Sequence, residues 1–254
     1  MKPPIRYRKK IPFFHDKSEV EFQRDDYERY DPTVIRQSAL HFCDHLWGAY
    51  PFQEVLDFVE AYLPPKMDNI LEIGCGVGRW IAELSQKYPK AQCWGIDYSY
   101  QMLKQAVAFW VDGQPISLNL TNKGFETPIS VDGHQIPNLQ FVLAKAATLP
   151  FADQSQDLLV HSFLIDRLPN PKEAMLEFHR VLAPNGLMCF ITPLNFNDAK
   201  NWADFYPPKK LFRWVDNSFE IMDTREKITI IEPLDIHGNH IHWNCVGIVA
   251  KKKN

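Results

Sequence analysis

A glycine-rich turn with an acidic residue on each side is the part of the chain best suited to chemistry. Gly74, Gly76 and Gly78 recur at every second position. Glu72 stands two residues before the first glycine, and Asp97 follows 19 residues after the last. Glycine lets a ligand approach bare backbone, and an acid about 20 residues beyond a glycine loop can accept hydrogen bonds from both ribose hydroxyls. The spacing therefore predicts a nucleotide site.

Short apolar runs predict the elements that position these residues. Residues 70–73 contain Ile, Leu and Ile, which is typical of a strand buried on both faces. After the glycines the pattern becomes helical, with Trp80, Ile81 and Leu84 on one face. A second strand is predicted over Gln92–Ile96. Since ligands bind at the carboxyl ends of strands in an open α/β sheet, we expect the acids and the glycines to lie together there.

Glu72 and the position of the third glycine separate two nucleotide ligands. A dinucleotide site is typically G-x-G-x-x-G, whereas here the third glycine comes one position early and is followed by Arg79 and Trp80. A carboxylate at Glu72 would repel a diphosphate but attract the ammonium group of an amino-acid moiety. A NAD-dependent oxidoreductase is therefore the less favoured interpretation.

The motifs E-I-G-C-G-V-G and G-I-D-Y-S resemble those of class I S-adenosyl-L-methionine (SAM) methyltransferases. Further along, A-A-T-L-P-F, Q-D-L-L-V-H-S-F and H-R-V-L-A-P-N-G-L-M are similar to the later motifs of the type 11 small-molecule family. The resemblance covers roughly residues 52–193. It implies a Rossmann-like, seven-stranded, mostly parallel sheet flanked by helices. The implied activity is transfer of a methyl group from SAM to a small organic molecule, leaving S-adenosyl-L-homocysteine. A domain that binds SAM or this product without catalysis is the alternative.

The resemblance also implies a set of cofactor contacts. Glu72 would reach the methionine ammonium, the glycine turn would contact the methionine part, and Asp97 would bind the ribose. The residues implied for the cofactor are Glu72, Gly74, Cys75, Gly76, Gly78, Asp97, Tyr98, Met102 and Ala146. Relatives commonly carry an Asp before this alanine, which accepts from the adenine amino group. This chain has Lys145, which cannot accept a hydrogen bond when charged. Adenine recognition must then use backbone or another residue.

The methyl acceptor is expected beside the strand that ends near residue 164. His161 and Asp166 are candidate general bases, and Arg167 is a candidate acceptor contact. The alternatives without a catalytic role are that His161 is a buried strand residue and that Asp166 and Arg167 form a surface ion pair. Aromatic residues from both ends of the chain are predicted to roof the acceptor, because they exclude water and suit a planar or apolar molecule. Packing in the core is the alternative. These candidates are Tyr27, Tyr30, Trp47, Phe196, Trp202 and Tyr206.

Three segments organise the rest of the chain. Residues 1–51 are interpreted as an N-terminal extension or lid, with a helix predicted over Pro32–Tyr50, and residues 52–254 as the SAM-binding domain. Residues 111–138 form a long link in which alternating residues around turn signals predict an inserted β-hairpin. This hairpin could be a flap over the substrate, a contact in a homodimer, or a surface decoration.

Composition excludes several classes of function. The formal net charge of −3 gives no overall basic field for nucleic acid. No apolar run approaches the roughly 20 residues of a membrane span. Five scattered cysteines without a C-x-x-C pair favour reduced thiols in the cytoplasm. The pair His41 and His45, and the trio His237, His240 and His242, lack the further ligands expected of a metal site, so no metal is predicted.

Overall fold

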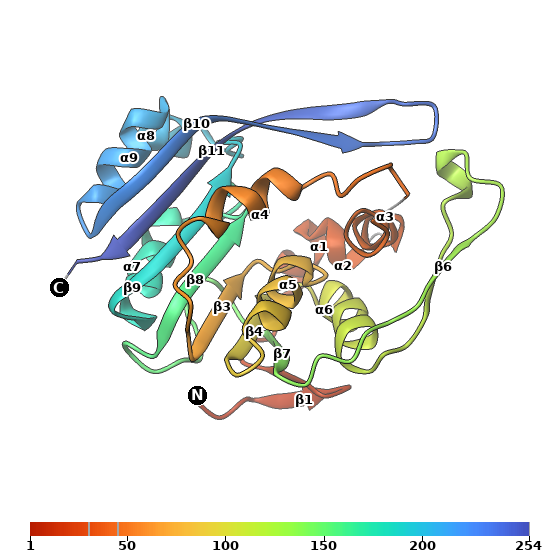
Figure 1. Cartoon of the computed structure of the whole chain (residues 1–254), viewed down its shortest axis with the longest axis horizontal. Coiled ribbons are helices and arrows are strands. Elements are labelled where there is room, and N and C mark those ends of the chain that lie inside the picture. Colours follow the sequence, from red (N-terminus) through yellow and green to blue (C-terminus); the bar gives the residue numbers. More distant parts are fainter. Residues whose placement is uncertain (30, 45, 254) are drawn as a thin grey trace.

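The computed structural model describes residues 1–29, 31–44 and 46–253. Its centre is a mixed sheet whose inner strands are parallel (Figure 1). In spatial order the strands are β1 (Arg6–Arg8), β2 (Ile11–Phe13), β7 (Leu139–Leu143), β4 (Gln92–Asp97), β3 (Asn69–Ile73), β8 (Gln156–Ser162), β9 (Leu182–Thr192), β11 (His240–Lys252) and β10 (Phe219–Pro233). The seven strands from β7 to β10 are those that the resemblance implies. The sheet has nine because the N-terminal hairpin β1–β2 joins it, with Phe13 pairing in parallel with Leu143.

The strand order reverses at β3, and this reversal defines the ligand-binding end of the sheet. From β3 the chain moves outward to β4 and β7, and then returns to the other side of β3 with β8 and β9. Ile73 pairs with Ile96 near the carboxyl ends of β3 and β4. Ligands of open α/β sheets bind where the order reverses in this way, so the loops after β3, β4 and β8 are expected to form the site.

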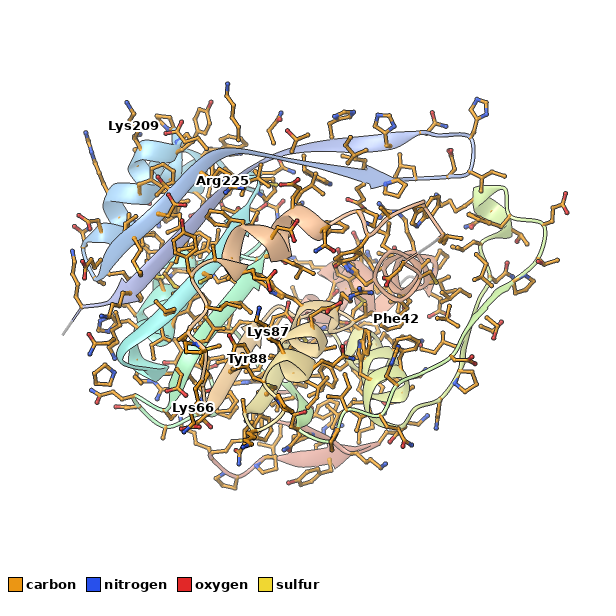
Figure 2. The ribbon with its side chains drawn as sticks, viewed as in Figure 1. Phe42, Lys66, Lys87, Tyr88, Lys209 and Arg225 are labelled. Atoms are coloured by element: carbon orange, nitrogen blue, oxygen red, sulfur yellow. The ribbon has the colours of Figure 1, made fainter. Side chains whose placement is uncertain are left out.

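Helices cover both faces of the sheet. One core cluster unites α5 (Arg79–Lys87), α6 (Tyr100–Ala106), α4 (Gln53–Glu60) and α3 (Asp31–Phe42), and the other unites α7 (Pro171–Val181), α8 (Ala199–Phe205) and α9 (Pro208–Asp216). Trp80, Ile81 and Leu84 are all buried, as their helical spacing predicted. Figure 2 shows Phe42 of α3 inside the molecule, whereas Lys87 and Lys209 lie at its surface. Phe42 stacks on Phe109 with ring centroids 4.0 Å apart.

The predicted insertion is a hairpin, as expected. A π-helical turn (Val107–Val111) leads into β5 (Ile116–Leu118), and β5 pairs with the antiparallel β6 (Ile129–Val131). Between them lies a short 3-10 helix (Thr121–Lys123). The Ile236 N–H, in the turn of the long hairpin β10–β11, donates to the Lys123 carbonyl at 3.2 Å. Two segments far apart in sequence therefore meet at this tip (Figure 1).

Several element boundaries differ from the sequence predictions. The helix predicted over Pro32–Tyr50 ends at Phe42, and α9 was not predicted. The N-terminal extension holds two further short helices, α1 (Glu19–Arg24) and α2 (Asp26–Arg29), while the domain boundary at residue 51 stays a prediction. Within the described ranges, each helix is too short or too polar to cross a lipid bilayer.

Candidate cofactor site and active site

The glycine turn follows β3 with a left-handed backbone at each of its three glycines. Its backbone N–H groups are used inside the protein. Cys75 N donates to Ile96 O at 2.9 Å, Gly76 N donates to Asp97 Oδ2 at 2.8 Å, and Gly78 N donates to Cys75 O at 2.8 Å. These bonds fix the turn against the end of β4. The turn therefore offers a ligand its Cα surfaces and carbonyl groups rather than these three donors.

The glycines at 76 and 78 serve different purposes. A Cβ atom built at Gly76 would meet only Met102 Cε within 4 Å, at 3.2 Å, so among the described residues there is room beside this glycine. A Cβ atom at Gly78 would overlap the Phe141 ring at 2.6 Å. Gly78 is thus required for helix-to-sheet packing, whereas Gly76 borders space that a ligand can occupy.

Asp97 is held in one orientation beside that space. Its Oδ2 accepts from Gly76 N and its Oδ1 accepts from Ser99 N, both at 2.8 Å. Burial raises the pKa of its carboxyl, although the residue keeps part of its surface exposed. Each oxygen retains a lone pair. A fixed carboxylate of this kind suits two neighbouring hydroxyl groups, as in a ribose.

Glu72 lies buried at the end of β3, where it also caps a helix. Its Oε2 accepts from Ile81 N at 2.9 Å, in the first turn of α5, whose N–H groups lack partners within the helix. Burial raises the pKa of Glu72 well above its ordinary value. A cation bound beside it would restore the ionised form. This arrangement fits an ammonium group better than a phosphate.

The loop between α3 and α4 packs on the start of α5, the helix that Glu72 caps. The Arg79 guanidinium lies 4.6 Å from the Tyr50 ring centroid and donates to His41 O at 3.1 Å. His41 Nδ1 and Tyr50 Oη are 2.8 Å apart. Burial raises the pKa of the Tyr50 phenol, and the negative charge of Glu72 adds to this. No metal was predicted at His41 and His45, and His45 lies outside the described residues.

Tyr98 and Lys145 lie on the adenine side that the resemblance implied. The Tyr98 ring has two ammonium groups near it, Lys17 Nζ at 4.7 Å and Lys145 Nζ at 5.3 Å from the centroid. Lys145 also pairs with Glu21 at 2.7 Å. Met102 is buried against the glycine turn, and Ala146 is half-buried beyond Lys145. The Lys145 side chain is thus paired with a residue of the N-terminal extension.

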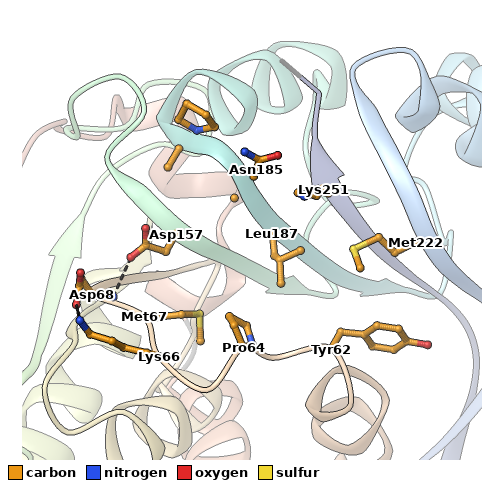
Figure 3. A pocket seen from close by; sticks show the side chains of 13 residues that line it. Tyr62, Pro64, Lys66, Met67, Asp68, Asp157, Asn185, Leu187, Met222 and Lys251 are labelled. Atoms are coloured by element: carbon orange, nitrogen blue, oxygen red, sulfur yellow. Dashed lines mark hydrogen bonds and ion pairs between the residues drawn. The ribbon is translucent and has the colours of Figure 1, made fainter.

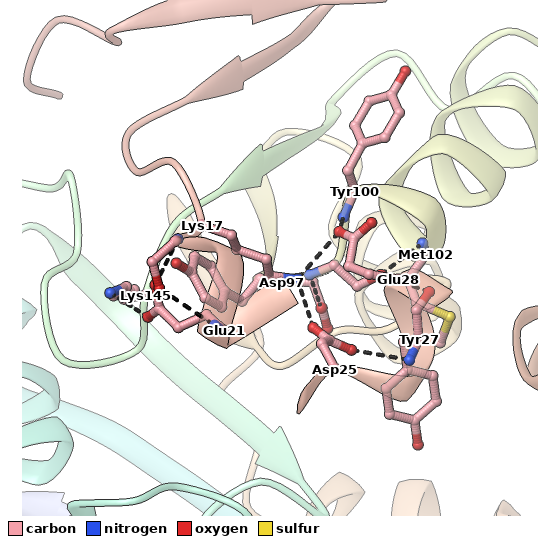
Figure 4. A network of polar contacts seen from close by, with 12 residues as sticks. Lys17, Glu21, Asp25, Tyr27, Glu28, Asp97, Tyr100, Met102 and Lys145 are labelled. Carbon is pink, nitrogen blue, oxygen red and sulfur yellow. Dashed lines mark hydrogen bonds and ion pairs between the residues drawn. The ribbon is translucent and has the colours of Figure 1, made fainter. Parts of the chain in front are cut away.

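Residues 15–29, here called the ionic segment, run along this end of the sheet and contact the residues that follow Asp97 (Figure 4). The Glu28 carboxylate accepts from Tyr100 N, and Ser99 Oγ donates to Tyr27 O at 3.3 Å. Tyr27 is 41% exposed. Burial of its phenol group raises the pKa, the charge of Asp97 adds to this, and the charge of Arg167 opposes it. Tyr27 therefore stands between the expected cofactor and acceptor sides.

His161 is placed where it cannot act on a bound acceptor. It is fully buried within β8, stacked on Phe190 with centroids 4.5 Å apart, and packed near Phe178 of α7. Both ring nitrogens lack a hydrogen-bond partner, and burial lowers its pKa to about 3. The structure does not support His161 as a general base, because an enclosed, unpartnered imidazole reaches no solvent-borne molecule.

Asp166 is enclosed as well, whereas Arg167 is open. The side chain of Asp166 has no exposed surface, its Oδ1 accepts from Thr192 Oγ1 at 3.0 Å, and Thr192 Oγ1 in turn accepts from Leu194 N at 3.1 Å. This chain of bonds fixes the end of β9. The placement does not support Asp166 as a general base. Arg167 Nε lies 3.6 Å from Asp166 Oδ2, and its side chain is 42% exposed and accessible to an acceptor.

The predicted aromatic roof is divided by the structure. Phe196, Trp202 and Tyr206 pack around α8, with Phe196 buried and Trp202 Nε1 donating to Phe196 O at 2.8 Å. Phe196 belongs with α9 to the second core cluster, on the face that also carries α7, whereas Trp202 and Tyr206 pack beside it with exposed surface. Trp47 packs edge-on against Phe125 of the insertion, at 5.5 Å. Tyr30 lies outside the described residues, so of the six only Tyr27 is placed next to the cofactor side.

A different aromatic cluster, missed in the sequence, stands at the end of β8. Phe163 has φ 53° and contacts Phe52 at 5.8 Å and Trp243 at 5.6 Å, both edge-to-face. Trp243 Nε1 donates to Glu232 Oε2 at 2.6 Å, and Glu232 pairs with Arg36 of α3. The signal was the position of Phe163 at the end of a predicted strand. Its partners came from segments too distant in sequence to be associated with it.

A groove of about 370 Å³ lies near the amino ends of the strands, away from the glycine turn (Figure 3). Asp157, one of its lining residues, already accepts from Asp68 N and Asn69 N at 2.8 and 2.9 Å. Other lining groups include Tyr62, whose hydroxyl donates to Asp223 at 2.6 Å. Asp157 and Tyr62 are therefore engaged within the protein, and within the described ranges no three metal-ligating side chains gather.

Comparison with known proteins agrees with the geometry. Residues 71–190 match the family model described as a methyltransferase domain. By this match, the chain contains a methyltransferase domain. The match begins within β3, continues through the glycine turn and Asp97, and ends in β9. The methyltransferase domain thus includes every element that positions the proposed cofactor contacts.

Relatives and solved structures are similar to parts of the chain. The demethylmenaquinone methyltransferase of Chlorobaculum parvum is 27% identical over 151 residues, covering 59% of this chain and 50% of that protein. That of Listeria monocytogenes is also 27% identical and is covered to 54%. The chain spans about half the length of these relatives. A SAM-dependent methyltransferase from Aquifex aeolicus has a TM-score of 0.52 at 16% identity, covering 88% of this chain and 100% of that one.

A methyltransferase from Haloferax volcanii, solved with the Trm112 methyltransferase activator, is a further similar structure. It has a TM-score of 0.57 at 14% identity and covers 91% of this chain and 99% of that one. At these identities the likeness shows the fold. It extends beyond the methyltransferase domain matched at residues 71–190, to most of the chain.

Proposed function

We propose that the chain transfers the methyl group of SAM to a small organic molecule. The observation that carries this proposal is that a fixed, partly exposed Asp97 carboxylate lies next to open space beside Gly76. The carboxylate can accept hydrogen bonds from a ribose, and the space admits a ligand that lies against the glycine turn.

The residues at the ends of β3 and β4 fit SAM. Glu72 would attract the ammonium group, Gly74, Cys75 and Gly76 would border the methionine part, and Asp97 would bind the ribose. Tyr98, Met102 and Ala146 would face the adenine, while Gly78 supports the turn through its packing on Phe141. SAM supplies a methyl group already activated by its sulfonium charge. The chain then has to hold the acceptor in line and exclude water.

The acceptor side favours a planar molecule with a polar or anionic group. Tyr27, Phe163 and Trp243 offer aromatic surface at least in part exposed, and Arg167 offers an accessible cation. The relatives named demethylmenaquinone methyltransferase support an organic acceptor. Trp202 and Tyr206 keep exposed surface near α8, so a role for them and for Phe196 in binding a larger acceptor stays part of the proposal.

Two further parts of the proposal concern the cell. All five cysteines are free and buried, which supports a reducing, cytoplasmic location.

The insertion hairpin β5–β6 ends in a tip that contacts the turn of β10–β11, and we propose this joint surface as a homodimer contact. Light scattering of the purified chain measures the oligomeric state and tests this contact.

Replacing Asp97 by Ala tests the cofactor assignment. We expect SAM affinity to fall by about 1–3 kcal/mol, because two ribose hydroxyls lose a charged acceptor. Calorimetry with SAM and, separately, with NAD measures this loss. Asp97→Asn keeps the shape of the side chain and one acceptor oxygen, so it should lie between the wild type and Asp97→Ala.

Asp153→Ala is the matched control, since Asp153 pairs with Arg180 far along the chain from the glycine turn. It should leave affinity unchanged. A folded Asp97→Ala variant that binds SAM as tightly as the wild type would remove Asp97 from the site. Binding of NAD in place of SAM would overturn the proposed function itself.

A further inference from the structure

The ionic segment is attached to the molecule without an apolar core of its own. Helices α1 and α2 bury no residue at all, and Val20 and Phe22 of α1 are 58% and 39% exposed. A surface helix normally docks through an apolar stripe. Polar contacts must therefore hold this segment in place.

Those polar contacts form one network around two lysines (Figure 4). Lys17 Nζ pairs with Asp25 at 2.5 Å and with Glu28 at 3.1 Å, and the side chains of Lys17 and Glu28 are only 9% and 6% exposed. Lys145 Nζ pairs with Glu21 at 2.7 Å, with both side chains nearly two-fifths exposed. Among these ion pairs, Lys145–Glu21 is the one that joins the ionic segment to the sheet.

The network ends on residues of the cofactor site. Lys17 and Lys145 both lie near the Tyr98 ring, and Glu28 accepts from Tyr100 N at the start of α6. The charges of Asp25 and Lys17 also act on the pKa of the Asp97 carboxyl. Any movement of the ionic segment therefore changes the surroundings of Asp97 and Tyr98.

We propose that Lys145 is a positioning residue that fastens the ionic segment over the bound nucleoside of SAM, so that cofactor affinity depends on the Lys145–Glu21 pair and on ionic strength. The inference rests on the proposed function, because it takes SAM as the ligand. Opening the segment breaks ion pairs but exposes little apolar surface, and salt screens exposed pairs strongly. Release of the ligand is then fast and sensitive to salt.

A double-mutant cycle tests this proposal with S-adenosyl-L-homocysteine as the probe in calorimetry. Lys145→Met keeps the length of the side chain, and Glu21→Gln keeps an acceptor for the Ser18 N–H that Glu21 now binds at 2.9 Å. Each variant should weaken binding about two- to fivefold at low salt, which is the range for an exposed ion pair. The double variant should be no weaker than either single one.

Salt provides a readout that a merely structural role would not change. Wild-type affinity should fall as sodium chloride rises from about 0.05 to 0.5 M, a range over which the screening length shortens severalfold. The Lys145→Met variant should be far less sensitive. Tryptic cleavage after the exposed Arg24 should be slowed by the probe in the wild type and much less in the variant.

Lys172→Met is the matched control. Lys172 Nζ pairs with Asp204 at the same 2.7 Å, on the α7–α8 side of the molecule, so its loss should leave binding and salt dependence unchanged. Additive losses in the cycle, or equal salt dependence of the wild type and Lys145→Met, would overturn the inference. A wild type that fails to bind the probe at all would instead refute the proposed function.

Discussion

Two adjacent stretches near the N-terminus are attached to the same end of the sheet by opposite means. Residues 11–14, here called the apolar segment, place Ile11 and Phe13 in the core, 0% and 3% exposed, with Phe14 N donating to Leu143 O at 2.9 Å. The ionic segment that follows has no buried residue in either of its helices. The apolar segment is part of the hydrophobic core, whereas the ionic segment is held at the surface by polar contacts.

The difference suits a permanent attachment for the apolar segment and a reversible one for the ionic segment. Apolar burial is non-directional and persists in salt, whereas ion pairs at a surface are weak, screened and quickly exchanged. The anchor at β7 keeps the ionic segment close to the cofactor site even when its ion pairs open. The segment can then reclose without a long search, because its effective concentration beside the site stays high.

The largest effect is expected from Phe13→Ala in the apolar segment. Phe13 lies in the core, also contacts Tyr100 at 5.6 Å, and has the Arg6 guanidinium 3.9 Å from its ring centroid. Its truncation should lower the free energy of unfolding by about 3–5 kcal/mol, as for other buried Phe→Ala changes. Urea unfolding followed by fluorescence measures the change. A loss below about 1 kcal/mol would mean that this stretch is no better anchored than the ionic segment.

An intermediate effect, on binding rather than on folding, is expected from Lys17→Met in the ionic segment. The change leaves Glu28 without its cation, and it does the same to Asp25, whose charge acts on Asp97. Affinity for S-adenosyl-L-homocysteine should fall about tenfold, since pairs with little exposure are worth more than surface ones. Lys10→Met, which removes the exposed Lys10–Asp112 pair, is the control. If Lys17→Met lowered the melting temperature as much as Phe13→Ala, the contrast between the segments would disappear.

The smallest effect concerns acid and His15, where the two segments meet. Lys145 N donates to His15 Nδ1 at 3.4 Å and His15 Nε2 lies 2.9 Å from Thr148 Oγ1, so the bonded imidazole is neutral. Burial, and then Lys145, lower its pKa, while Glu21 opposes this. The neutral form is therefore complete above the ordinary pKa of about 6.5 and is lost as pH falls through the lowered value.

Acidification from about pH 7.5 to 5.5 should accordingly weaken binding of the probe, by about twofold or less if only this bond is broken. His15→Gln can donate and accept in the same place without titrating, and it should lose less affinity in acid. The part of the loss that both proteins share belongs to other groups. Identical pH profiles for the two would show that His15 does not couple acid to the ionic segment.

Much of the fold could be predicted because its signals are local. The apolar runs of β3, β4, β7 and β8 and the glycine turn each identify themselves within about ten residues. Their order then implies a parallel sheet with the site at its carboxyl end. Asp97 could be placed beside the turn for the same reason, and the structure brings it to Gly76 N.

What could not be predicted depends on contacts between distant segments. Nothing near Phe13 indicates that it pairs with Leu143, and nothing near Lys145 indicates Glu21 as its partner. His161 illustrates the opposite error, since its residue type suggested chemistry while its place in β8 faces Phe190 and α7. Likewise an aromatic residue after a strand can face either side of the sheet, so Phe196 joined α8 and Phe163 joined Trp243.

The pairing of β2 with β7 also has a consequence for biosynthesis. Phe13 leaves the ribosome 130 residues ahead of Leu143, its partner in the sheet. Until then Ile11 and Phe13 are apolar residues on a nascent chain with nothing to cover them, and this interval invites chaperone binding. Residues 11–13 therefore wait for a partner strand that is made much later. The N-terminal segment can take its place only on a β7 that has already been made, just as it would have to reclose over its ligand on a strand that is already in place.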